Sequence, residues 1–587
     1  MAINGIGQNL PRGVRYTLYV DDYCIFVSGK NVTEIQMLLQ ESIDSSTKWI
    51  NDKGFKFSVA KTCAVTFTRH HRIPQPRLLL YGQPVQYKPQ TKYLGVIFDS
   101  RLTFLPHIDY LKTECTQRLN LLKVLSHKSW GADRKTLLML HQMLVLSKLD
   151  YGCQVYASSA KSHLRKLDSI HNSGLRLSTG AFKSTPIDSL YAETGFYSLE
   201  MRRDKICLKY TMRVCTKYSL YMYRNVFNDY FLRGFSNSPR ILKPFNIRMN
   251  MLLTELNIVN NISVCTVLKK PPWQIPDISF CKELTLIKKS SVPDYYLRNL
   301  FIEHFALHEG SVPIYTDGSK SEDGVGFAVI FPELCVKRRL PDVCSIFTAE
   351  LSAILLALQY TYTFNDTSYI IVSDSQSALA AIEKYNPFHP VVQEIQEWLY
   401  ILYSSGKTVA FCWVPSHIGI HMNDLADSKA KAAVTNRNIS HRRVPSIDYY
   451  PIIESKLKSK WNEIWVNTSL SNKLRTIKSN VSIWESSYHK QRQWEVVLAR
   501  LRLGHTRLTH KFLMEKTDAP ICRDCRVRLT VQHFLIDCPK YVEQRNIFLK
   551  IPRSESLSLK SVLAESEFFN IENIMKFLAE IGILNDI

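Results

Sequence analysis

Residues 313–319, PIYTDGS, begin the stretch of sequence that decides the fold. They form a short apolar run with an acid near its end, and three more strand-like runs follow. These are 324–331 (GVGFAVIF), 369–374 (YIIVSD) and 408–413 (TVAFCW). Apolar residues at helical spacing predict helices over 346–363, 376–385, 391–403 and 423–434. Such alternation is typical of a mixed α/β domain, which we place at residues 306–440.

Four acidic residues lie at the ends or on the faces of these elements. Asp317 is in the first strand-like run and Asp374 ends the third, whereas Glu350 and Asp427 are on predicted helices. A single aspartate at a strand end is usually a cap or turn residue. If the sheet and helices pack, however, the four carboxylates share one rim, where mutual repulsion raises their pKa values. A divalent cation would compensate this charge, and ligands that are all oxygen favour Mg²⁺ or Mn²⁺.

The chemistry expected of such a rim is the hydrolysis of a phosphodiester. Two cations a few ångströms apart can stabilise both the attacking and the leaving oxygen of the displacement. His417 lies in the loop that precedes the last acid. An imidazole at that place can shuttle a proton or help to release the product.

Four segments of this region resemble a known family. They read TDGSK (316–320), TAELSAI (348–354), SDSQSAL (373–379) and PSHIGIHMNDLAD (415–427). Their order and spacing are similar to those of type-1 ribonuclease H. The catalytic residues of that family match Asp317, Glu350, Asp374, Asp427 and His417. Asp424 stands where glutamate is commoner in the family, which is a small departure outside the carboxylate set.

This resemblance implies a ribonuclease H-like mixed sheet with flanking helices. It implies an enzyme that cuts the RNA strand of RNA–DNA hybrids endonucleolytically, with two Mg²⁺ or Mn²⁺ ions held by the four acids. The family reads 2′-hydroxyls across a shallow minor groove, so we expect binding that tolerates any sequence and weakens with salt. The residues expected to contact the substrate are Gly318, Ser319, Ser375, Gln376 and Asn423.

The N-terminal part of the chain carries a second acidic pattern. Residues 16–27, YTLYVDDYCIFV, predict a β-hairpin with Asp21 and Asp22 at its tip. A helix is predicted from Thr33 to about Lys53. Further predicted elements are strands at 55–59, 63–68 and 92–98 and a mostly helical region over 107–240. Residues 241–300 are punctuated by proline, and we interpret them as a connector with short elements.

Several segments of this part resemble a second family. They are Tyr19-Val20-Asp21-Asp22, Lys61-Thr62, Tyr93-Leu94-Gly95-Val96, LDYGCQVY (149–156) and the segment 175–203. Their order is similar to that in the palm, primer grip, thumb and connector of reverse transcriptases from non-LTR retrotransposons of the jockey and I-element kind. In that family a third metal-binding aspartate and the fingers precede the hairpin, whereas 18 residues precede Tyr19 here. We therefore expect a truncated polymerase without activity, in which Asp21 and Asp22 bind a cation only weakly.

Near the C-terminus, three cysteines and a histidine have the spacing of zinc ligands. They are Cys522, Cys525, His533 and Cys538. Their order resembles the C-terminal Cys/His motif of the same retrotransposon polyproteins. One interpretation is a structural Zn²⁺ site, flanked by Arg502, Arg507 and Lys511 as phosphate contacts. The alternative is three free thiols and a histidine that lie close by chance.

Composition limits the class of protein further. Among the 587 residues, 45% are hydrophobic, which excludes a mainly disordered chain. Lys and Arg outnumber Asp and Glu by 75 to 52, and the net charge of +23 favours nucleic acid as a partner. The remaining cysteines are mostly scattered singly, as in a reducing compartment. With neither a signal-peptide pattern nor an apolar run of about 20 residues, we expect an intracellular protein of the nucleus or cytoplasm, neither secreted nor membrane-bound.

These observations predict a multidomain α/β protein. The predicted domains are a partial reverse transcriptase palm (1–105), a helical thumb and connector (106–240), a linker (241–305), a ribonuclease H domain (306–440) and a helical region with the Cys/His motif (441–587). The predicted function is hydrolysis of RNA in RNA–DNA hybrids within a retrotransposon-derived protein. The alternatives are a non-catalytic nucleic-acid-binding remnant and, less favoured, an active RNA-directed DNA polymerase.

Overall fold

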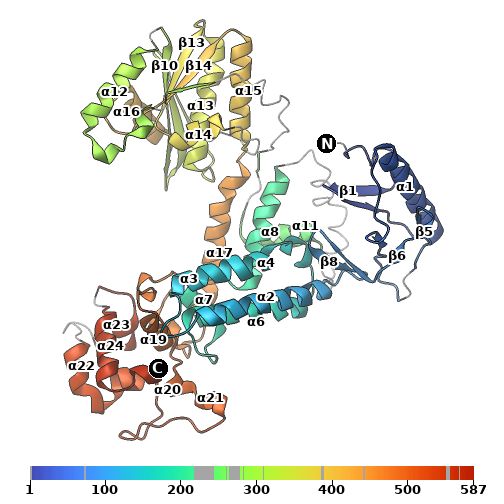
Figure 1. Cartoon of the computed structure of the whole chain (residues 1–587). Coiled ribbons are helices and arrows are strands. Elements are labelled where there is room, and N and C mark those ends of the chain that lie inside the picture. Colours follow the sequence, from blue (N-terminus) through green and yellow to red (C-terminus); the bar gives the residue numbers. More distant parts are fainter. Residues whose placement is uncertain are drawn as a thin grey trace. The chain divides into compact units, whose positions relative to one another are not determined.

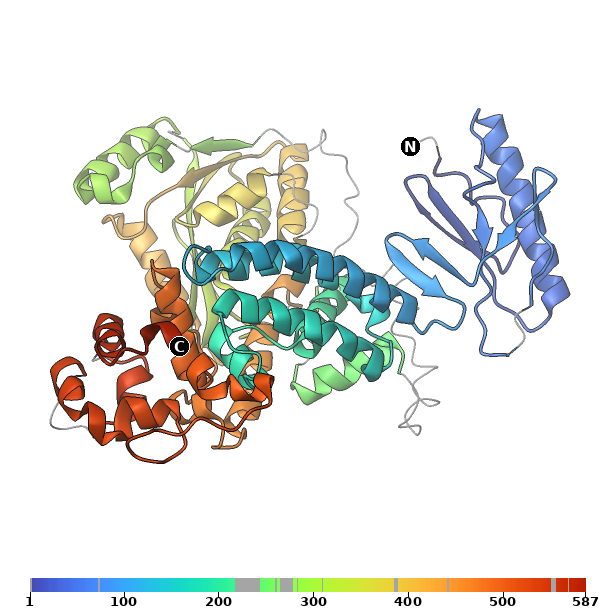
Figure 2. The same cartoon turned by 60° about the horizontal axis from the view of Figure 1, so that its bottom comes forward.

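A computed structural model of the chain divides it into two compact units (Figures 1 and 2). One unit comprises Asp204–Lys460, and the other combines Met1–Arg203 with Trp461–Ile587. The residues that the structure describes are 3–71, 74–216, 243–258, 261–263, 278–281, 283–308, 310–384, 389–440, 443–549, 556–567 and 569–587. Among these residues, no helix is both long and apolar enough to cross a membrane.

The unit of residues 204–460 is built on a six-stranded mixed sheet. Its strand order is β12 (Cys335–Leu340), β11 (Gly324–Ile330), β10 (Val312–Ser321), β13 (Ser368–Ser373), β14 (Thr408–Trp413) and β9 (Ser279–Cys281). The first three strands are antiparallel, and β10, β13, β14 and β9 run parallel to one another. The four predicted strands and the mixed α/β architecture are confirmed, whereas β12 and β9 were not predicted.

Helices cover both faces of this sheet. They are α12 (Asp294–Ala306), α13 (Ile346–Thr363), α14 (Gln376–Glu383), α15 (Pro390–Ser404) and α16 (His421–Ala433). Helix α13 packs against β10 and β11 and is joined on its face by α14 and α15, whereas α16 packs on the other face (Figure 1). The helix α13 begins after Ser345, whose hydroxyl accepts the backbone N–H of Thr348 at 3.2 Å. The predicted helices are therefore confirmed, with ends that differ by at most a few residues.

One strand of the sheet and one of its covering helices lie in the predicted linker. Strand β9 and helix α12 fall between residues 278 and 306, and Leu297 and Phe301 of α12 are buried in the same apolar cluster as Ile370 and Val372 of β13. Helix α11 (Phe245–Glu255) lies in the same stretch. The predicted boundary at residue 240 falls outside the described residues. The predicted domain limits therefore stay predictions, and part of the expected linker is structured.

In the other unit, the N-terminal segment forms small two-stranded sheets beside one long helix, and all but the β3–β6 pair are antiparallel. Strands β1 (Arg15–Tyr19) and β2 (Asp22–Phe26) make the predicted hairpin, and α1 (Val32–Asp52) is the predicted helix. The remaining strand pairs are β3 (Cys63–Ala64) with β6 (Gln86–Tyr87), β4 (Leu79–Leu80) with β5 (Gln83–Pro84), and β7 (Gln90–Tyr93) with β8 (Val96–Asp99).

Three predicted strands in this segment are wrong in part. Residues 92–98 are two strands joined by a tight turn, because Leu94 (φ 44°) and Gly95 (φ 81°) both take the left-handed conformation that such a hairpin turn requires. Residues 55–59 contain no strand, and of 63–68 only Cys63–Ala64 pairs with another strand. The apolar runs at 55–59 and 63–68 are typical of strands, but a strand forms only where a second strand is available to pair with it.

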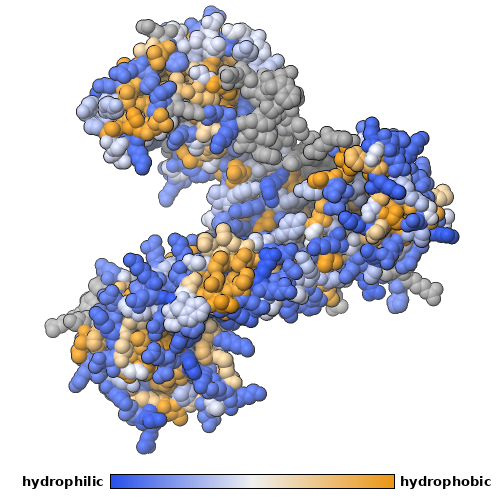
Figure 3. All heavy atoms as spheres, in the orientation of Figure 1, coloured by the Kyte–Doolittle hydropathy of each residue, from blue (hydrophilic) through white to orange (hydrophobic). Residues whose placement is uncertain are grey.

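The helical region that follows is confirmed as far as residue 215. Its helices include α2 (Leu105–Leu125), α3 (Arg134–Leu140), α6 (Lys161–Thr179), α7 (Ile187–Thr194) and α8 (Leu199–Cys215). Residues 217–240 of the predicted thumb lie outside the described part of the chain. Apolar side chains at Leu121, Val124, Met139 and Met143 are largely exposed, and Figure 3 shows an apolar patch over α3 and the adjoining end of α2.

The C-terminal segment shares one core with these helices. Its helices are α18 (Lys473–Ile477), α19 (Arg492–Leu503), α20 (Arg507–His510), α21 (Phe512–Glu515), α22 (Val542–Phe548), α23 (Leu559–Leu563) and α24 (Ile571–Glu580). Buried carboxylates link the two segments. The carboxylate of Glu193 pairs with Arg134 at 2.8 Å and also accepts the hydroxyl of Ser487 at 3.1 Å. The backbone N–H of Arg134 donates to the carboxylate of Glu495 at 2.7 Å. Because a buried carboxylate that loses a partner is costly, 461–587 and the helices before residue 203 stabilise each other.

Candidate active site and candidate metal sites

Three carboxylates converge at the end of the central strands of the six-stranded sheet. Thr316 of β10 is paired with Ser373, the last residue of β13, so Asp317 on β10 and Asp374 just beyond β13 come close together. Helix α13 brings Glu350 to the same place. The ligand oxygens of Asp317, Glu350 and Asp374 all lie within 4.8 Å of one another.

The close approach of α13 depends on a glycine. A Cβ atom added to Gly318 would lie 2.7 Å from the backbone nitrogen of Glu350, which is too close for any side chain. The glycine next to Asp317 therefore lets the helix backbone lie against β10. The same backbone group contacts both acids, because hydrogen bonds from Gly318 lower the pKa of Asp317 and of Glu350. This effect was not predicted from the sequence, which suggested Gly318 only as a substrate contact.

Burial and mutual repulsion dominate the electrostatics of the group. Burial, followed by the charges of Asp374 and Asp427, raises the pKa of Asp317 to about 8. Burial and the charge of Asp317 raise the pKa of Glu350 well above its usual value. The pKa of Asp374 is also raised, again mainly by burial. The three acids are therefore so close together and so buried that at least one of them is protonated at neutral pH when no metal is bound.

Two oxygens of this group lack any hydrogen-bond partner among the described residues. They are Oδ2 of Asp317 and Oε2 of Glu350, and both side chains are less than a tenth exposed. Buried carboxylate oxygens without a donor are costly unless a cation or ordered water contacts them. This donor set, all oxygen and converging on one point, fits Mg²⁺ or Mn²⁺.

The fourth predicted acid is near the other three but outside their group. Asp427 of α16 raises the pKa of both Asp317 and Asp374 through its charge. Its own carboxylate pairs with Lys431 at 2.7 Å, one helical turn further on. Lys431 was not singled out from the sequence, although its i,i+4 spacing from the acid is the usual signal for such a pair.

The predicted histidine is exposed in the loop between β14 and α16. His417 takes the left-handed conformation (φ 55°), which is uncommon for a side chain of this size, and its charge lowers the pKa of Asp374. The loop thus holds an exposed imidazole close to one of the three converging acids.

The residues predicted to contact the substrate lie near this acidic group and differ in how exposed they are. Ser319 continues β10 beyond Asp317, and Ser375 and Gln376 begin α14 directly after Asp374. Gln376 is exposed, whereas Asn423 is only 3% exposed. The side-chain oxygen Oδ1 of Asn423 has no partner among the described residues. Gly318, Ser319 and Asn423 therefore lie on elements that carry predicted acids, whereas Ser375 and Gln376 directly follow one of them in the chain.

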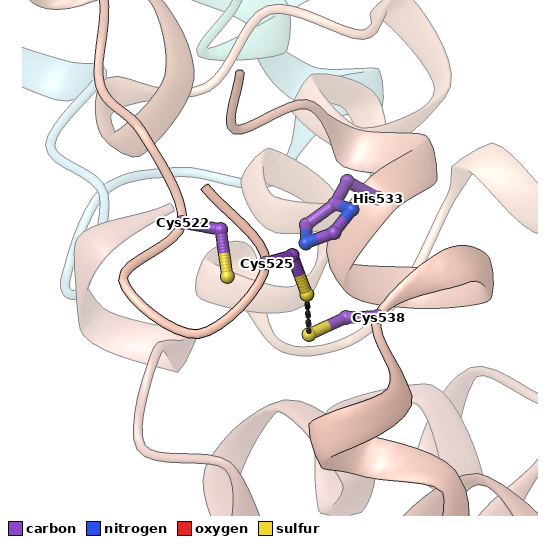
Figure 4. A group of neighbouring side chains, drawn as sticks. All are labelled: Cys522, Cys525, His533 and Cys538. Atoms are coloured by element: carbon purple, nitrogen blue, oxygen red, sulfur yellow. Dashed lines mark hydrogen bonds between the residues drawn. The ribbon is translucent and has the colours of Figure 1, made fainter. Parts of the chain in front are cut away.

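Figure 4 shows the second predicted metal-ligand group, in the C-terminal segment. Single ligand atoms of Cys522, Cys525, His533 and Cys538 all lie within 4.8 Å of one another. The sulfurs of Cys525 and Cys538 are 3.7 Å apart. Cys522 and Cys525 lie on a tight loop, whereas His533 begins a short helical turn (His533–Asp537) that leads into Cys538.

The chemistry of this group suits a thiophilic cation. Nε2 of His533 is buried and has no partner among the described residues. A hydrogen bond from the backbone N–H of Cys525 lowers the pKa of the Cys522 thiol to about 6. A lowered pKa favours the thiolate, which is the form that binds a metal. Three sulfurs and one imidazole fit the tetrahedral preference of Zn²⁺.

Two further sets of predicted functional residues lie outside these two groups. Asp21 and Asp22 are exposed at the tip of the β1–β2 hairpin and join no metal-ligand group among the described residues. Arg502, expected to contact phosphate, is 1% exposed and donates to the carbonyl of Leu563 and the hydroxyl of Ser487. That prediction for Arg502 is wrong, because its guanidinium is a buried structural group.

Comparison with known proteins agrees with this geometry. Residues 309–435 match the sequence model of the RNase H family. The α/β region that carries the acidic group is therefore an RNase H domain.

The chain is also similar to proteins of mobile elements and retroviruses. It is 28% identical to the RNA-directed DNA polymerase from mobile element jockey of Drosophila funebris over 182 residues, which are 31% of this chain and 19% of that protein. It is 28% identical to the probable RNA-directed DNA polymerase from transposon X-element of Drosophila melanogaster, over 28% of this chain and 18% of that protein. The Pol polyprotein of equine infectious anemia virus is 30% identical over 31% of this chain and 16% of its own length.

The matched segment thus spans about a fifth or less of each of these relatives. Together, the RNase H domain and the relatives identify the chain as related to the polyproteins of retrotransposons that carry a reverse transcriptase and an RNase H.

Proposed function

We propose that the RNase H domain of this chain hydrolyses the RNA strand of RNA–DNA hybrids, in the manner of type-1 enzymes. The observation that carries the proposal is the convergence of Asp317, Glu350 and Asp374 within 4.8 Å of one another, at the end of a sheet whose sequence matches the RNase H family. The name of each polymerase relative is consistent with a protein that meets such hybrids.

The three converging acids, together with Asp427, would hold two divalent cations. The unpartnered oxygens of Asp317 and Glu350 support this, since both face a group of like charges without a donor. When bound, Mg²⁺ or Mn²⁺ supplies charge stabilisation to the attacking and the leaving oxygen of a phosphodiester.

The chain's own groups would orient the hybrid and move protons. Gly318, which has no side chain, lets α13 bring Glu350 next to Asp317, and Ser319 and Gln376 are placed to donate to phosphate or 2′-hydroxyl oxygens. The exposed imidazole of His417 would hold or release a proton beside Asp374. Lys431 would neutralise the charge of Asp427 until a divalent cation displaces its ammonium from that carboxylate.

The test is cleavage of an end-labelled RNA–DNA hybrid by the full chain. We expect cleavage in Mg²⁺ and none in EDTA, and we expect Asp374→Asn to abolish it while hybrid binding in a mobility-shift assay is kept or strengthened. Glu322→Gln is the matched control, because it removes an exposed acid from the β10–β11 turn of the same domain and should leave cleavage unchanged. Near wild-type turnover of Asp374→Asn would refute the assignment.

A second candidate function is binding of nucleic acid without catalysis, which the net charge of +23 favours. The same experiment separates the two. A folded chain that binds the hybrid but never cuts it in Mg²⁺ or Mn²⁺ would support the binding module.

We also propose that Cys522, Cys525, His533 and Cys538 hold one structural Zn²⁺. The support is the proximity of the four ligand atoms and the buried, unpartnered Nε2 of His533. A closed set of four protein ligands leaves no open position, which indicates a structural rather than a catalytic ion.

A further inference from the structure

Two cysteines that are far apart in the sequence face each other on the edge of the six-stranded sheet. Strand β9 pairs in parallel with β14, and Cys281 is the direct partner of Cys412. Paired residues on adjacent strands project to the same face, so both thiols lie on one side of the sheet. The neighbouring pair, Phe280 and Phe411, stacks with ring centroids 5.3 Å apart and fixes the register.

A histidine from a third segment completes the group. His308 follows α12, and its Nε2 lies 3.0 Å from Sγ of Cys281. Cys412 is 2% exposed, whereas Cys281 is partly exposed. A small molecule can therefore reach Cys281 but not Cys412. Hydrogen bonds from Cys412 and then His308 lower the pKa of Cys281 to about 6.

We propose that Cys281 and Cys412 form a reversible disulfide, with His308 as the base that activates Cys281. The oxidant we name is a hydroperoxide such as hydrogen peroxide. This site is separate from the acidic group, and the proposal does not depend on hydrolytic activity.

The proposed reaction balances in two steps. His308 accepts the proton of the Cys281 thiol, and the thiolate attacks one peroxide oxygen, so that an S–O bond forms and the O–O bond breaks. The second oxygen leaves with that proton as water, and Cys281 becomes a sulfenic acid. The sulfur of Cys412 then attacks the sulfur of Cys281, an S–S bond forms, and the hydroxyl leaves with the Cys412 proton as a second water. Two thiols are oxidised by two electrons, and one peroxide is reduced.

The spacing of the pair suits a disulfide. Adjacent strands lie about 4.7–4.9 Å apart, which is within the range of about 4.4–6.8 Å that the Cα atoms of a disulfide span. The bond can therefore form without a large movement of β9. Because β9 is an edge strand and Cys281 is partly exposed, an added thiol can reach the bond and reduce it.

The first test is peptide mapping of the full wild-type chain. The reduced protein is treated with increasing hydrogen peroxide, its remaining thiols are alkylated, and its peptides are analysed by mass spectrometry. We expect a Cys281–Cys412 linked pair, lighter by two hydrogens and restored by dithiothreitol, before Cys335 is modified. Cys335 is the internal control, because it is exposed and lies on β12 of the same sheet. Oxidation of Cys335 first, or no linked pair at any dose, would overturn the proposal.

Two variants test the assigned roles. At pH 6, His308→Gln should slow alkylation of Cys281 by about fivefold while the rate at Cys335 stays the same, because losing this hydrogen bond raises the pKa of the thiol and the thiolate fraction falls. Cys412→Ala should leave Cys281 as a sulfenic acid that dimedone traps, since the resolving thiol is gone. An unchanged Cys281 rate in His308→Gln would remove the histidine from the mechanism. If Cys412→Ala fails to fold, the peptide mapping of the wild-type chain is the test of whether the disulfide forms.

Discussion

The ligand atoms of the acidic group and those of the Cys/His group lie within 4.8 Å of one another, yet different kinds of structural element hold the two groups. The three acids are carried by β10, β13 and α13, which form part of a buried sheet and its covering helix. The Cys/His group is carried by one tight loop and one short helical turn. The repulsion among the acids therefore destabilises a domain whose buried sheet and helices hold it together. The Cys/His group instead cross-links a segment that has little buried structure of its own.

The neighbouring helices show why the two sites differ. Helix α13, which carries Glu350, has 18 residues and is buried over most of its length. The helices next to the Cys/His group, α20 and α21, have four residues each. Helices that short are not stable by themselves in water. Local order in residues 505–545 therefore has to come from packing and from a cross-link such as a bound metal.

The largest effect we predict is a local collapse of this segment when its metal is lost. Cys525→Ser should reduce zinc to well below one ion per chain and strongly increase hydrogen exchange across residues 520–540. Metal-ligand energies on the order of 10 kcal/mol support so large a change. Cys335→Ser is the matched control, with zinc content and exchange unchanged. In contrast, EDTA should not increase exchange in β10 or α13, and equal loosening of both regions would break the comparison.

The next effect is a pH dependence of cation binding at the acidic group. Since the pKa of Asp317 is about 8 and that of Glu350 is also raised, the metal-free site holds at least one proton at pH 7 that Mg²⁺ must displace. Apparent affinity should rise by at least about tenfold for each pH unit below 8. Calorimetry in buffers of different ionisation enthalpy should show release of at least one proton at pH 7 and fewer at higher pH. Binding that releases no proton at pH 7 would contradict the raised pKa.

The repulsion among the acids should lower the stability of the metal-free domain, and this effect can be measured. In the folded state the raised pKa values favour protonation, so stability falls as pH rises from about 4 to about 8, where Asp317 and its neighbours ionise. Asp374→Asn removes one of these charges and should stabilise the metal-free domain by about 1 kcal/mol at pH 8. Hydrogen exchange of β10 and α13 in EDTA, corrected for its intrinsic pH dependence, measures the change. Glu322→Gln should have no such effect, and a destabilised Asp374→Asn would argue against repulsion.

The smallest effect concerns Lys431, whose ammonium occupies one oxygen of Asp427 at 2.7 Å. Lys431→Met should lower the Mg²⁺ concentration needed for half-maximal cleavage by about threefold, because a competing cation is removed. Lys429→Met, two residues earlier on α16, is the control and should leave the metal dependence unchanged. A higher Mg²⁺ requirement in Lys431→Met would mean that the lysine positions Asp427 rather than competes for it.

The buried elements of the RNase H domain could be predicted almost completely from the sequence. Helix α13 has the predicted bounds, because a long apolar run follows a capping serine. Strand β12 (CVKRRL) was missed because it is an edge strand whose basic side chains are exposed, so it lacks an apolar signal. The turn at Leu94 and Gly95 was missed because leucine rarely takes a left-handed conformation.

The candidate sites were predictable in part only. The motifs indicated which acids to consider, and the structure brings Asp317, Glu350 and Asp374 together. The pairing of Asp427 with Lys431 and the contact between Gly318 and α13 depend on how helices pack, which no local pattern shows. The approach of Cys281 to Cys412 requires the pairing of two distant strands, and such long-range contacts leave no trace in composition or spacing.

The unit that combines residues 1–203 with 461–587 has a consequence for how the protein is made. The backbone N–H of Arg134 finds its acceptor, Glu495, 361 residues later. At about 5–20 residues per second, a ribosome needs roughly 20–70 s to reach it. During that time the apolar side chains of α6 and α7 that pack against the C-terminal segment, such as Leu175 and Leu190, lack that partner, while the RNase H domain is already synthesised. The speed of translation between the two segments therefore sets how long these side chains stay without their final contacts.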